Sequence, residues 1–297
     1  MQAVVTLAGE GTRMLPWSRG LRKEFLPLYD RGSAGELVLK PVAHLVVESL
    51  AGAGADRVTV VVQPRDAGFV QSYFSVDQGL LLRHRRTPDR LVETRRFYRT
   101  LGQVQFGFVS QPRAAGFGDA VLCAKGTVGR EPFFLHAGDG VILERERGSV
   151  LRAMGRLRED EDLDGVLLVR PVADSRRYGV VEGVPEGAVG PYRRLRVTGM
   201  VEKPKRPRTH WAATAVYVFG PALFPALEAV RRTERPEELE LTSGVQHLLA
   251  HGGRFAALTL SPRTGVWCSV GSPEGYALAL ARTRGRARRL PRPQAND

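Results

Sequence analysis

Apolar residues along the first 220 positions follow two alternating patterns. Short runs rich in β-branched residues predict buried strands, and longer stretches with helical spacing of the apolar residues predict helices. The predicted strands cover residues 4–8, 57–63, 104–111, 133–137 and 165–172. The predicted helices cover residues 41–53, 118–125 and 149–158. This alternation indicates a Rossmann-like α/β fold, in which a mostly parallel, mixed sheet is flanked by helices.

The pattern changes after residue 178. Three predicted strands follow in close succession and favour a small β-rich extension; they cover residues 178–184, 195–203 and 212–219. Further on, the pattern predicts helices at 221–231 and 241–251, a strand at 254–260 and a last helix from residue 273. We expect one domain over 1–280, with halves of about 1–175 and 176–280. Residues 281–297, rich in arginine, are expected to form a disordered basic tail.

The composition is that of an ordinary globular protein. The chain has 297 residues, of which 43% are hydrophobic and 25% charged, enough to bury a large core. The N-terminus lacks the layout of a signal peptide, and no apolar run reaches membrane-spanning length. We therefore expect a cytoplasmic protein with no membrane partner. Cys123 and Cys268 are the only cysteines, and their spacing fits neither a disulfide framework nor a zinc site.

The formal net charge of +13 is compatible with two classes of ligand. A strongly basic chain can bind nucleic acid, but the same charge suits an enzyme whose ligands are all phosphates. No motif that interleaves aromatic and basic residues accompanies the charge, so we expect no nucleic-acid partner.

The loop after the first strand carries the clearest chemical signal. Two glycines in Gly9-Glu10-Gly11-Thr12-Arg13 allow backbone N–H groups to approach a large anion. Arg13 offers a planar, permanently charged fork for phosphate oxygens, and Lys23 can add a point charge. The loop is neither a dinucleotide fingerprint, because Met14 replaces the third glycine, nor a P-loop. By spacing alone, a tight β-turn explains it better than a phosphate-binding loop does.

A second loop follows the strand that ends at Gln111. Gly116 and Gly118 lie in this loop, and Asp119 is expected to cap the helix that follows. A glutamine amide donates and accepts side by side, which matches the imide edge of uracil or thymine. A simple strand–loop–helix corner would explain the glycines but not the glutamine.

Charged residues also follow two later strands. Asp139 comes after an apolar strand, where ligands gather in an open α/β sheet, and a carboxylate there suits Mg²⁺. A plain turn residue is the alternative. Glu202 and Lys203 end another strand, but charge pairs are common at strand ends, so this pair is informative only through its order and spacing relative to the other motifs.

These motifs together resemble the signature of bacterial sugar-1-phosphate nucleotidylyltransferases. The match is closest to the UTP–glucose-1-phosphate uridylyltransferases and spans residues 1–280, with five motifs in the family's order. It includes Gly9-x-Gly11-Thr12-Arg13-Met14-Leu15-Pro16, Lys23-Glu24-Phe25-Leu26-Pro27 and Glu202-Lys203-Pro204. The resemblance implies transfer of a nucleoside monophosphate to a sugar 1-phosphate, with UTP favoured, dTTP possible, and Mg²⁺ as cofactor. It also implies a homo-oligomer, either a dimer or a tetramer.

The resemblance also assigns residues to roles. The catalytic residues it implies are Arg13, Lys23 and Lys203. The nucleotide-binding residues are Ala8, Gly9, Gly11, Thr12, Gln111 and Gly116. The sugar-binding residues are Gly179, Glu202, Lys203 and Tyr217, and the metal ligand is Asp139. On this assignment the first half of the domain binds base and phosphates, and the second half binds the sugar.

Three departures from the family pattern leave a second hypothesis open. Ser269 stands where a second metal-binding aspartate is usual, two residues before Gly271. Ala215 replaces a glycine two residues before Tyr217, and Thr209-His210 replaces a Ser-Asn pair. The changes flank the expected sugar pocket, so a sugar other than glucose can be the substrate. The alternative is a catalytically degenerate relative that binds a nucleotide or sugar nucleotide and has a regulatory role.

Overall fold

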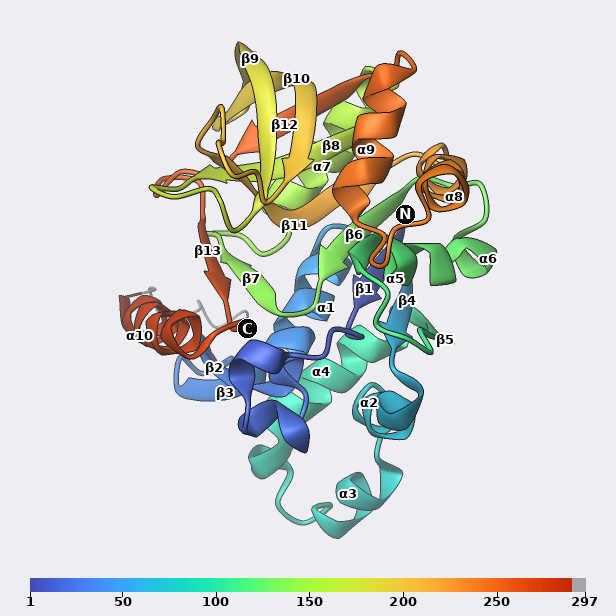
Figure 1. The fold of residues 1–297 in the computed structure, drawn as a ribbon. Coiled ribbons are helices and arrows are strands. Elements are labelled where there is room, and N and C mark those ends of the chain that lie inside the picture. Colours follow the sequence, from blue (N-terminus) through green and yellow to red (C-terminus); the bar gives the residue numbers. More distant parts are fainter. Residues whose placement is uncertain (290–297) are drawn as a thin grey trace.

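A nine-stranded mixed sheet forms the centre of the protein (Figure 1). The structure, a computed structural model, describes residues 1–289. The sheet has the order β5-β4-β1-β6-β11-β8-β12-β10-β9. Its strands are β1 (Gln2–Thr6), β4 (Arg57–Val62), β5 (Gln105–Ser110), β6 (Phe133–Ala137), β8 (Gly165–Pro171), β9 (Gly179–Val189), β10 (Tyr192–Glu202), β11 (Trp211–Phe219) and β12 (Phe255–Thr259). The α/β fold and the predicted strands are confirmed.

Strand direction divides the sheet into two parts. The strands β5, β4, β1 and β6 are parallel, so their carboxyl ends lie at one edge. Beyond β6, β11 is antiparallel to both of its neighbours in the sheet order, and β10 is antiparallel to β12 and β9. The second part therefore mixes directions, as the close succession of predicted strands after residue 178 implies.

Helices cover both faces of the sheet. They are α1 (Val42–Gly52), α2 (Ala67–Tyr73), α3 (Gln78–Arg83), α4 (Val92–Gly102), α5 (Phe117–Cys123), α6 (Lys125–Val128), α7 (Ser149–Asp160), α8 (Leu223–Glu234), α9 (Leu241–Ala250) and α10 (Pro273–Arg289). Within residues 1–289, no helix is both long enough and apolar enough to cross a lipid bilayer.

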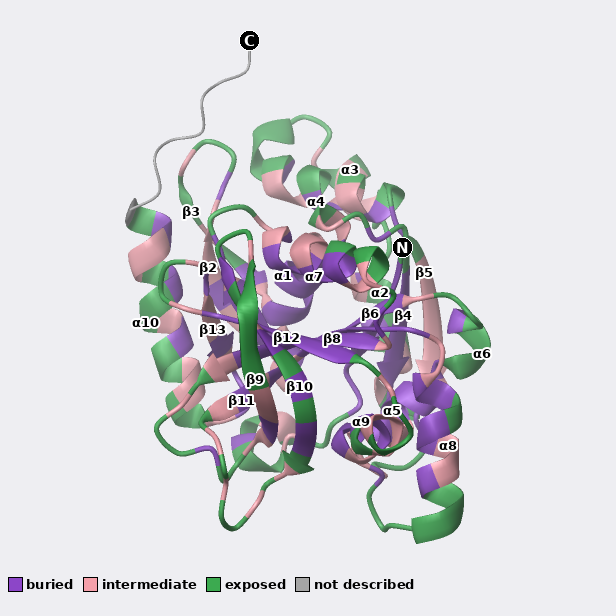
Figure 2. Cartoon of the chain, turned by 90° about the horizontal axis from the view of Figure 1, so that it is seen from above, coloured by how far each residue is buried: buried purple, intermediate pink, exposed green. Residues whose placement is uncertain are grey.

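Two hydrophobic cores fix β1 between the helical layers. Ala3, Val5 and Leu7 pack into one core with α1 and α7, while Val4 and Ala8 pack into the other with α5, α8 and α9. Figure 2 shows the central strands of the sheet buried, the edge strand β9 largely exposed and the outer faces of the helices exposed. Because each fully buried valine or leucine contributes about 1.5–3 kcal/mol, the end of β1 is a rigid support for the loop that follows.

Two small sheets were not predicted from the sequence. One joins β2 (Pro27–Arg31) to β3 (Leu37–Pro41), and the two strands form a hairpin. The other joins β7 (Gly140–Leu143) to β13 (Val266–Ser269), which are more than 120 residues apart. These strands are short, and their pairing depends on contacts that no local pattern encodes.

The prediction of a disordered tail from residue 281 was wrong as far as residue 289. Residues 281–289 continue α10, which packs against β2 and β13 (Figure 1). The physical reason is a stripe of small residues: Ala279, Thr283 and Ala287 recur every fourth position and are buried. The arginines between them dominate the composition and conceal this stripe. Residues 290–297 lie outside the described part of the chain.

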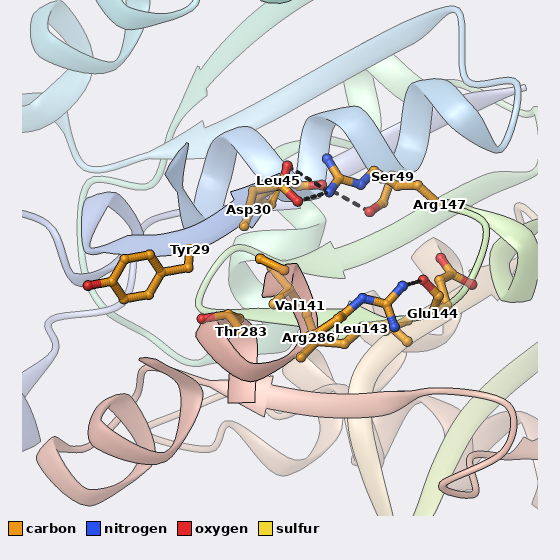
Figure 3. A pocket seen from close by; sticks show the side chains of 12 residues that line it. Tyr29, Asp30, Leu45, Ser49, Val141, Leu143, Glu144, Arg147, Thr283 and Arg286 are labelled. Atoms are coloured by element: carbon orange, nitrogen blue, oxygen red, sulfur yellow. Dashed lines mark hydrogen bonds and ion pairs between the residues drawn. The ribbon is translucent and has the colours of Figure 1, made fainter. Parts of the chain in front are cut away.

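Beneath α10 is a small polar cavity that supports the fold (Figure 3). Its volume of about 40 Å³ has room for little more than a water molecule. Asp30 on the hairpin accepts two hydrogen bonds of 3.0 Å from Arg147, and Lys40 lies 2.9 Å from the same carboxylate. Arg286 of α10 donates to the carbonyl of Glu144. These paired charges join the hairpin, α10 and the loop before α7, and we regard the cavity as structural.

Candidate functional site

Three of the parallel strands, β1, β5 and β6, end at one pocket of about 380 Å³. We call it the glycine-loop pocket, because the loop after β1 forms one wall. Its lining includes Ala8, Gly9, Gly11, Thr12, Lys23, Glu24, Gln111, Gly116, Asp139 and Glu238. Sequence motifs that are up to 130 residues apart are therefore brought together, as expected at the carboxyl edge of an open α/β sheet.

Left-handed backbone geometry at Gly11 shapes the loop after β1. Its φ of 69° favours glycine, and a Cβ there would lie 3.2 Å from the Cβ of Ser18. The Ser18 hydroxyl donates to the carbonyl of Gly11 at 2.8 Å. Three short 3₁₀ turns then carry the chain to Lys23. The glycine thus serves the tight turn itself, as well as leaving the loop amides uncovered.

Arg22 fastens this loop to the sheet and was missed in the sequence analysis. Its guanidinium is buried and donates to the carbonyls of Leu7 and Gly9, the second at 2.6 Å. It also lies 3.2 Å from Asp66 and 3.4 Å from Glu24. Each of these partners is set by the fold, so no spacing in the sequence distinguishes Arg22 from its arginine neighbours.

Lys23 and Asp139 form an ion pair at the bottom of the pocket, with 2.6 Å between Nζ and Oδ2. Burial alone would lower the pKa of Lys23 and raise that of Asp139. Their mutual attraction outweighs burial, so the pKa of Lys23 is raised and that of Asp139 is lowered. Burial raises the pKa of the neighbouring Glu24 to about 7, although Arg22 and Lys23 oppose the rise.

Ser269 lies beside Asp139, at the place of the second aspartate in the family pattern. The β7–β13 pairing sets Ser269 opposite Gly140, and the amide of Val270 donates to the carbonyl of Asp139 at 2.8 Å. A Cβ on Gly271 would lie 3.2 Å from Oδ2 of Asp139 and 3.3 Å from both the Ser269 hydroxyl and a nitrogen of Arg13. Three polar groups therefore converge on one point, and the backbone geometry keeps position 269 next to Asp139.

The loop after β5 differs in one respect from its prediction. Gly116, not Asp119, occupies the N-cap position of α5, so the predicted cap was wrong. Asp119 instead accepts a hydrogen bond of 2.9 Å from the amide nitrogen of Gln111, which also donates to the carbonyl of Gly116 at 3.2 Å. These bonds fix the buried amide and leave its carbonyl oxygen to accept from a ligand N–H.

The segment around Leu239, which the sequence analysis did not identify, packs so close to Gly116 that only glycine fits there. Its φ is 101°, and a Cβ there would lie 2.4 Å from the carbonyl oxygen of Leu239. The amide of Leu239 donates to Ala115 at 2.8 Å, and that of Gly118 donates back to Leu239 at 2.7 Å. This packing brings Glu238 to the wall of the glycine-loop pocket.

The residues expected to bind sugar form a separate cluster. Gly179 pairs with Glu202 across β9 and β10, and Lys203 Nζ lies 3.2 Å from Glu202 and 3.7 Å from Glu240. Burial, together with the charges of Glu202 and Glu240, raises the pKa of Tyr217. None of these five residues is part of the glycine-loop pocket lining. Glu240 was missed because it precedes α9 and reaches the cluster only through the fold.

A second pocket, of about 470 Å³, meets the glycine-loop pocket at Asp139, and the five residues of the sugar cluster are not part of its lining either. We call it the arginine pocket. Its lining includes Arg13, Asp139, Arg170, Arg177, Tyr178, Ala213, Thr214, Ala215, Ser269 and Arg282. Asp139 lines both pockets, and Tyr178, next to Gly179, accepts the amide of Lys203 at 3.0 Å through its carbonyl. The site thus has two compartments with one carboxylate at their junction.

The donors at the junction fit a magnesium ion that arrives with a phosphate ligand. Within residues 1–289, no cluster of three or more His, Cys, Asp or Glu side chains could hold a metal alone. Asp139 offers one carboxylate, with the Ser269 hydroxyl nearby. Mg²⁺ commonly takes one or two protein carboxylates and completes its shell with substrate phosphates and water.

Comparison with known proteins agrees with this geometry. Residues 2–284 match the nucleotidyl transferase family. The chain belongs to that family. UTP–glucose-1-phosphate uridylyltransferase of Mycoplasma pneumoniae is 29% identical over 283 residues, which cover 94% of this chain and 90% of the relative. The enzyme of the same name from Escherichia coli K12 is 31% identical over 259 residues, covering 84% and 80%.

Solved structures show the same fold. UDP-glucose pyrophosphorylase in its apo form has a TM-score of 0.80 and 23% identity, covering 96% of this chain and 99% of that chain. The UTP-bound UGPase from Acinetobacter baumannii has a TM-score of 0.75 and 24% identity, covering 95% and 92%. The nucleotidyl transferase fold therefore extends over nearly the whole chain.

Ala215 adopts a backbone conformation that favours glycine. Its φ is 56°, and it lies in an irregularity of β11, where the pairing with β8 shifts register between Ala213 and Tyr217. A left-handed conformation costs an L-residue about 1–2 kcal/mol. The protein thus keeps the bulge where the family pattern has glycine, and adds a methyl group at the wall of the arginine pocket.

Replacing Ala215 by glycine tests this strain. We expect Ala215→Gly to keep or increase the free energy of unfolding, because relief of the left-handed strain offsets the entropy cost of glycine. Ala213→Gly is the matched control: it is half-buried on the same strand without positive φ, and we expect it to lose about 0.5–1 kcal/mol. Chemical denaturation should separate the two variants by about 1–2 kcal/mol. Equal losses would show that Ala215 carries no strain.

Proposed function

We propose that the protein transfers UMP from UTP to a sugar 1-phosphate and releases pyrophosphate. The observation that carries the proposal is the position of Asp139, which lines both pockets and has Lys23, Arg13 and Ser269 around it. A group transfer between two ligands needs such a junction. Membership of the nucleotidyl transferase family and the names of the relatives support the same reaction.

In this reaction an oxygen of the sugar phosphate attacks the α-phosphorus of UTP in line and expels pyrophosphate. No covalent intermediate with the protein is needed, so the residues act by positioning and by stabilising charge. The amides from Gly9 to Thr12 would hold the triphosphate together with Arg13. Lys23 would exchange Asp139 for the α-phosphate, since both are anionic oxygen partners for its ammonium.

The nucleotide would lie in the glycine-loop pocket, and the sugar 1-phosphate would lie between the arginine pocket and the neighbouring sugar cluster. Gln111, held by Gly116 and Asp119, would accept the imide N–H of uracil with its free carbonyl oxygen. This contact does not distinguish UTP from dTTP, which share the imide edge. Gly179, Glu202 and Tyr217 would meet the sugar hydroxyls, while Lys203 would neutralise its phosphate.

Asp139 is the residue that would hold Mg²⁺, with the Ser269 hydroxyl as a weak neutral neighbour. A bound Mg²⁺ supplies charge neutralisation of the phosphate oxygens. Three statements remain predictions: that Asp139 is the only carboxylate that holds Mg²⁺, that the protein is cytoplasmic, and that it forms a homo-oligomer.

A panel assay that pairs each NTP with several sugar 1-phosphates and measures pyrophosphate tests the proposal. We expect turnover with UTP, and Arg13→Ala should reduce kcat by two or more orders of magnitude, because developing phosphate charge loses a guanidinium partner. Arg19→Ala, an exposed arginine of the same loop, is the control and should be nearly normal. Nucleotide binding without any pyrophosphate release would favour the degenerate, regulatory relative.

Gln111→Ala tests the base contact. We expect the variant to prefer UTP over ATP less than the wild type does. Expressed as a free energy from the ratio of kcat/KM values, the loss should be about 1–3 kcal/mol, which is typical when a buried hydrogen-bond partner is lost. Gln105→Ala, at the exposed other end of β5, should retain the preference. A wild-type enzyme that prefers ATP or GTP would overturn this assignment of the loop.

Ser269→Asp tests the metal site. A second carboxylate beside Asp139 should lower the Mg²⁺ concentration at half-maximal rate, whereas Asp139→Asn should abolish activity at ordinary Mg²⁺. Ser272→Asp is the matched control, because it adds the same charge to the arginine pocket. Aspartate there can still cap α10, as the Ser272 hydroxyl does by accepting from the Gly275 amide. An unchanged half-saturating Mg²⁺ in Ser269→Asp would mean that position 269 does not face the metal.

A further inference from the structure

The arginine pocket holds more positive charge than a neutral sugar needs. Arg13, Arg170, Arg177 and Arg282 line it, and Asp139 is the only carboxylate in the lining. That carboxylate is already engaged by Lys23 at 2.6 Å. Like charges gathered in one pocket repel one another, so the arrangement is favourable mainly when an anion occupies it.

Three of these arginines stand apart from the phosphate-binding loop. Arg170 ends β8, Arg177 lies in the segment before β9, and Arg282 lies on α10. Among the ion pairs of residues 1–289, none involves these three side chains, whereas the adjacent Arg176 pairs with Asp174 at 2.8 Å. Arg177 and Arg282 are exposed, so the charge of these three guanidiniums is not neutralised by a carboxylate among the described residues and can meet an anionic ligand.

Arg170 is held in place yet incompletely satisfied. Its guanidinium lies 5.2 Å from the centre of the Tyr178 ring, a cation–π contact that fixes its orientation. Its Nε is buried and makes no hydrogen bond within the described residues. A buried donor without a partner is costly, and an anionic oxygen in the pocket would be one way to satisfy its guanidinium.

We propose that the sugar 1-phosphate bound by this protein carries a second anionic group, a carboxylate or a phosphate, which Arg170, Arg177 and Arg282 receive. This inference rests on the proposed function and specifies its substrate. A guanidinium fork matches both oxyanions in two-point geometry, and the 470 Å³ pocket has the size of a small-molecule site. Uronic acid 1-phosphates and hexose bisphosphates are the two sources of this chemistry.

The kinetic test compares three sugar phosphates with UTP: glucose 1-phosphate, glucuronic acid 1-phosphate and glucose 1,6-bisphosphate. We expect one of the acidic substrates to exceed glucose 1-phosphate at least about tenfold in kcat/KM, and which one it is identifies the second anion. Arg177→Gln combined with Arg282→Gln should reduce that preference about tenfold or more, chiefly through KM. Arg284→Gln, an exposed arginine on α10, is the control and should keep the preference. Equal or better use of glucose 1-phosphate by the wild type would overturn the inference.

A different role for the arginines would have its own signature. If they hold the pyrophosphate leaving group, the double variant lowers kcat/KM equally for all three sugar phosphates and raises KM for pyrophosphate in the reverse direction. That result would also overturn the inference, because the preference among sugars would be unchanged.

Calorimetry separates this inference from the proposed function. Each sugar phosphate is titrated into the full chain with a UTP analogue whose α–β bridge cannot be cleaved. Tighter binding of an acidic sugar phosphate, lost in the double variant, supports the inference even if no NTP and sugar pair releases pyrophosphate. If glucose 1-phosphate binds as tightly as the two compounds with a second anionic group, the inference is contradicted, whatever the turnover.

Discussion

The ion pair between Lys23 and Asp139 is the interaction on which the site depends. It joins the loop after β1 to the turn between β6 and β7, and both groups are largely buried. Removing charges from water is costly, and the partner 2.6 Å away is the main group that favours the charged form of each. In the reaction that we propose, a triphosphate with its metal ion would offer both groups partners of the opposite sign. In the free protein the pair therefore keeps one positive and one negative side chain in fixed positions. Each side chain would then contact a ligand in place of the other without a change of fold.

Much of the frame for this pair follows from local sequence. The apolar runs predict the strands, and a parallel sheet places Ala8, Gln111 and Asp139 at one edge because each follows a strand. Arg22, Glu240 and the segment at Leu239 could not be predicted in the same way. Their contacts join residues from distant segments or depend on loop geometry. The buried stripe of α10 was present in the sequence, but the arginines around it suggested disorder.

The departures from the family pattern acquire physical meaning only in the structure. Ser269 keeps the position beside Asp139 because the β7–β13 pairing fixes its backbone, so the charge has been lost while the geometry has been kept. Ala215 likewise keeps the left-handed bulge despite its methyl group. Both changes lie at the arginine pocket. They alter its charge and its volume, whereas the glycine-loop pocket has the residues of the family pattern, which agrees with the proposed division into a nucleotide pocket and a changed sugar pocket.

The number of arginines alone does not indicate a ligand site. What indicates one is whether each arginine is paired with a carboxylate. Elsewhere in the fold arginines are neutralised in place: Arg147 by Asp30 and Glu48, and Arg194 by Glu161 and Glu186. Such pairs hold elements together and leave little charge for a ligand. In the arginine pocket the guanidiniums face a space whose only carboxylate is already engaged. Because arginine cannot lose its proton near neutral pH, that positive potential persists until an anion enters. Serine at position 269, where the family pattern has an aspartate, leaves the pocket without a second carboxylate, and this favours the acidic sugar phosphate that we propose as substrate.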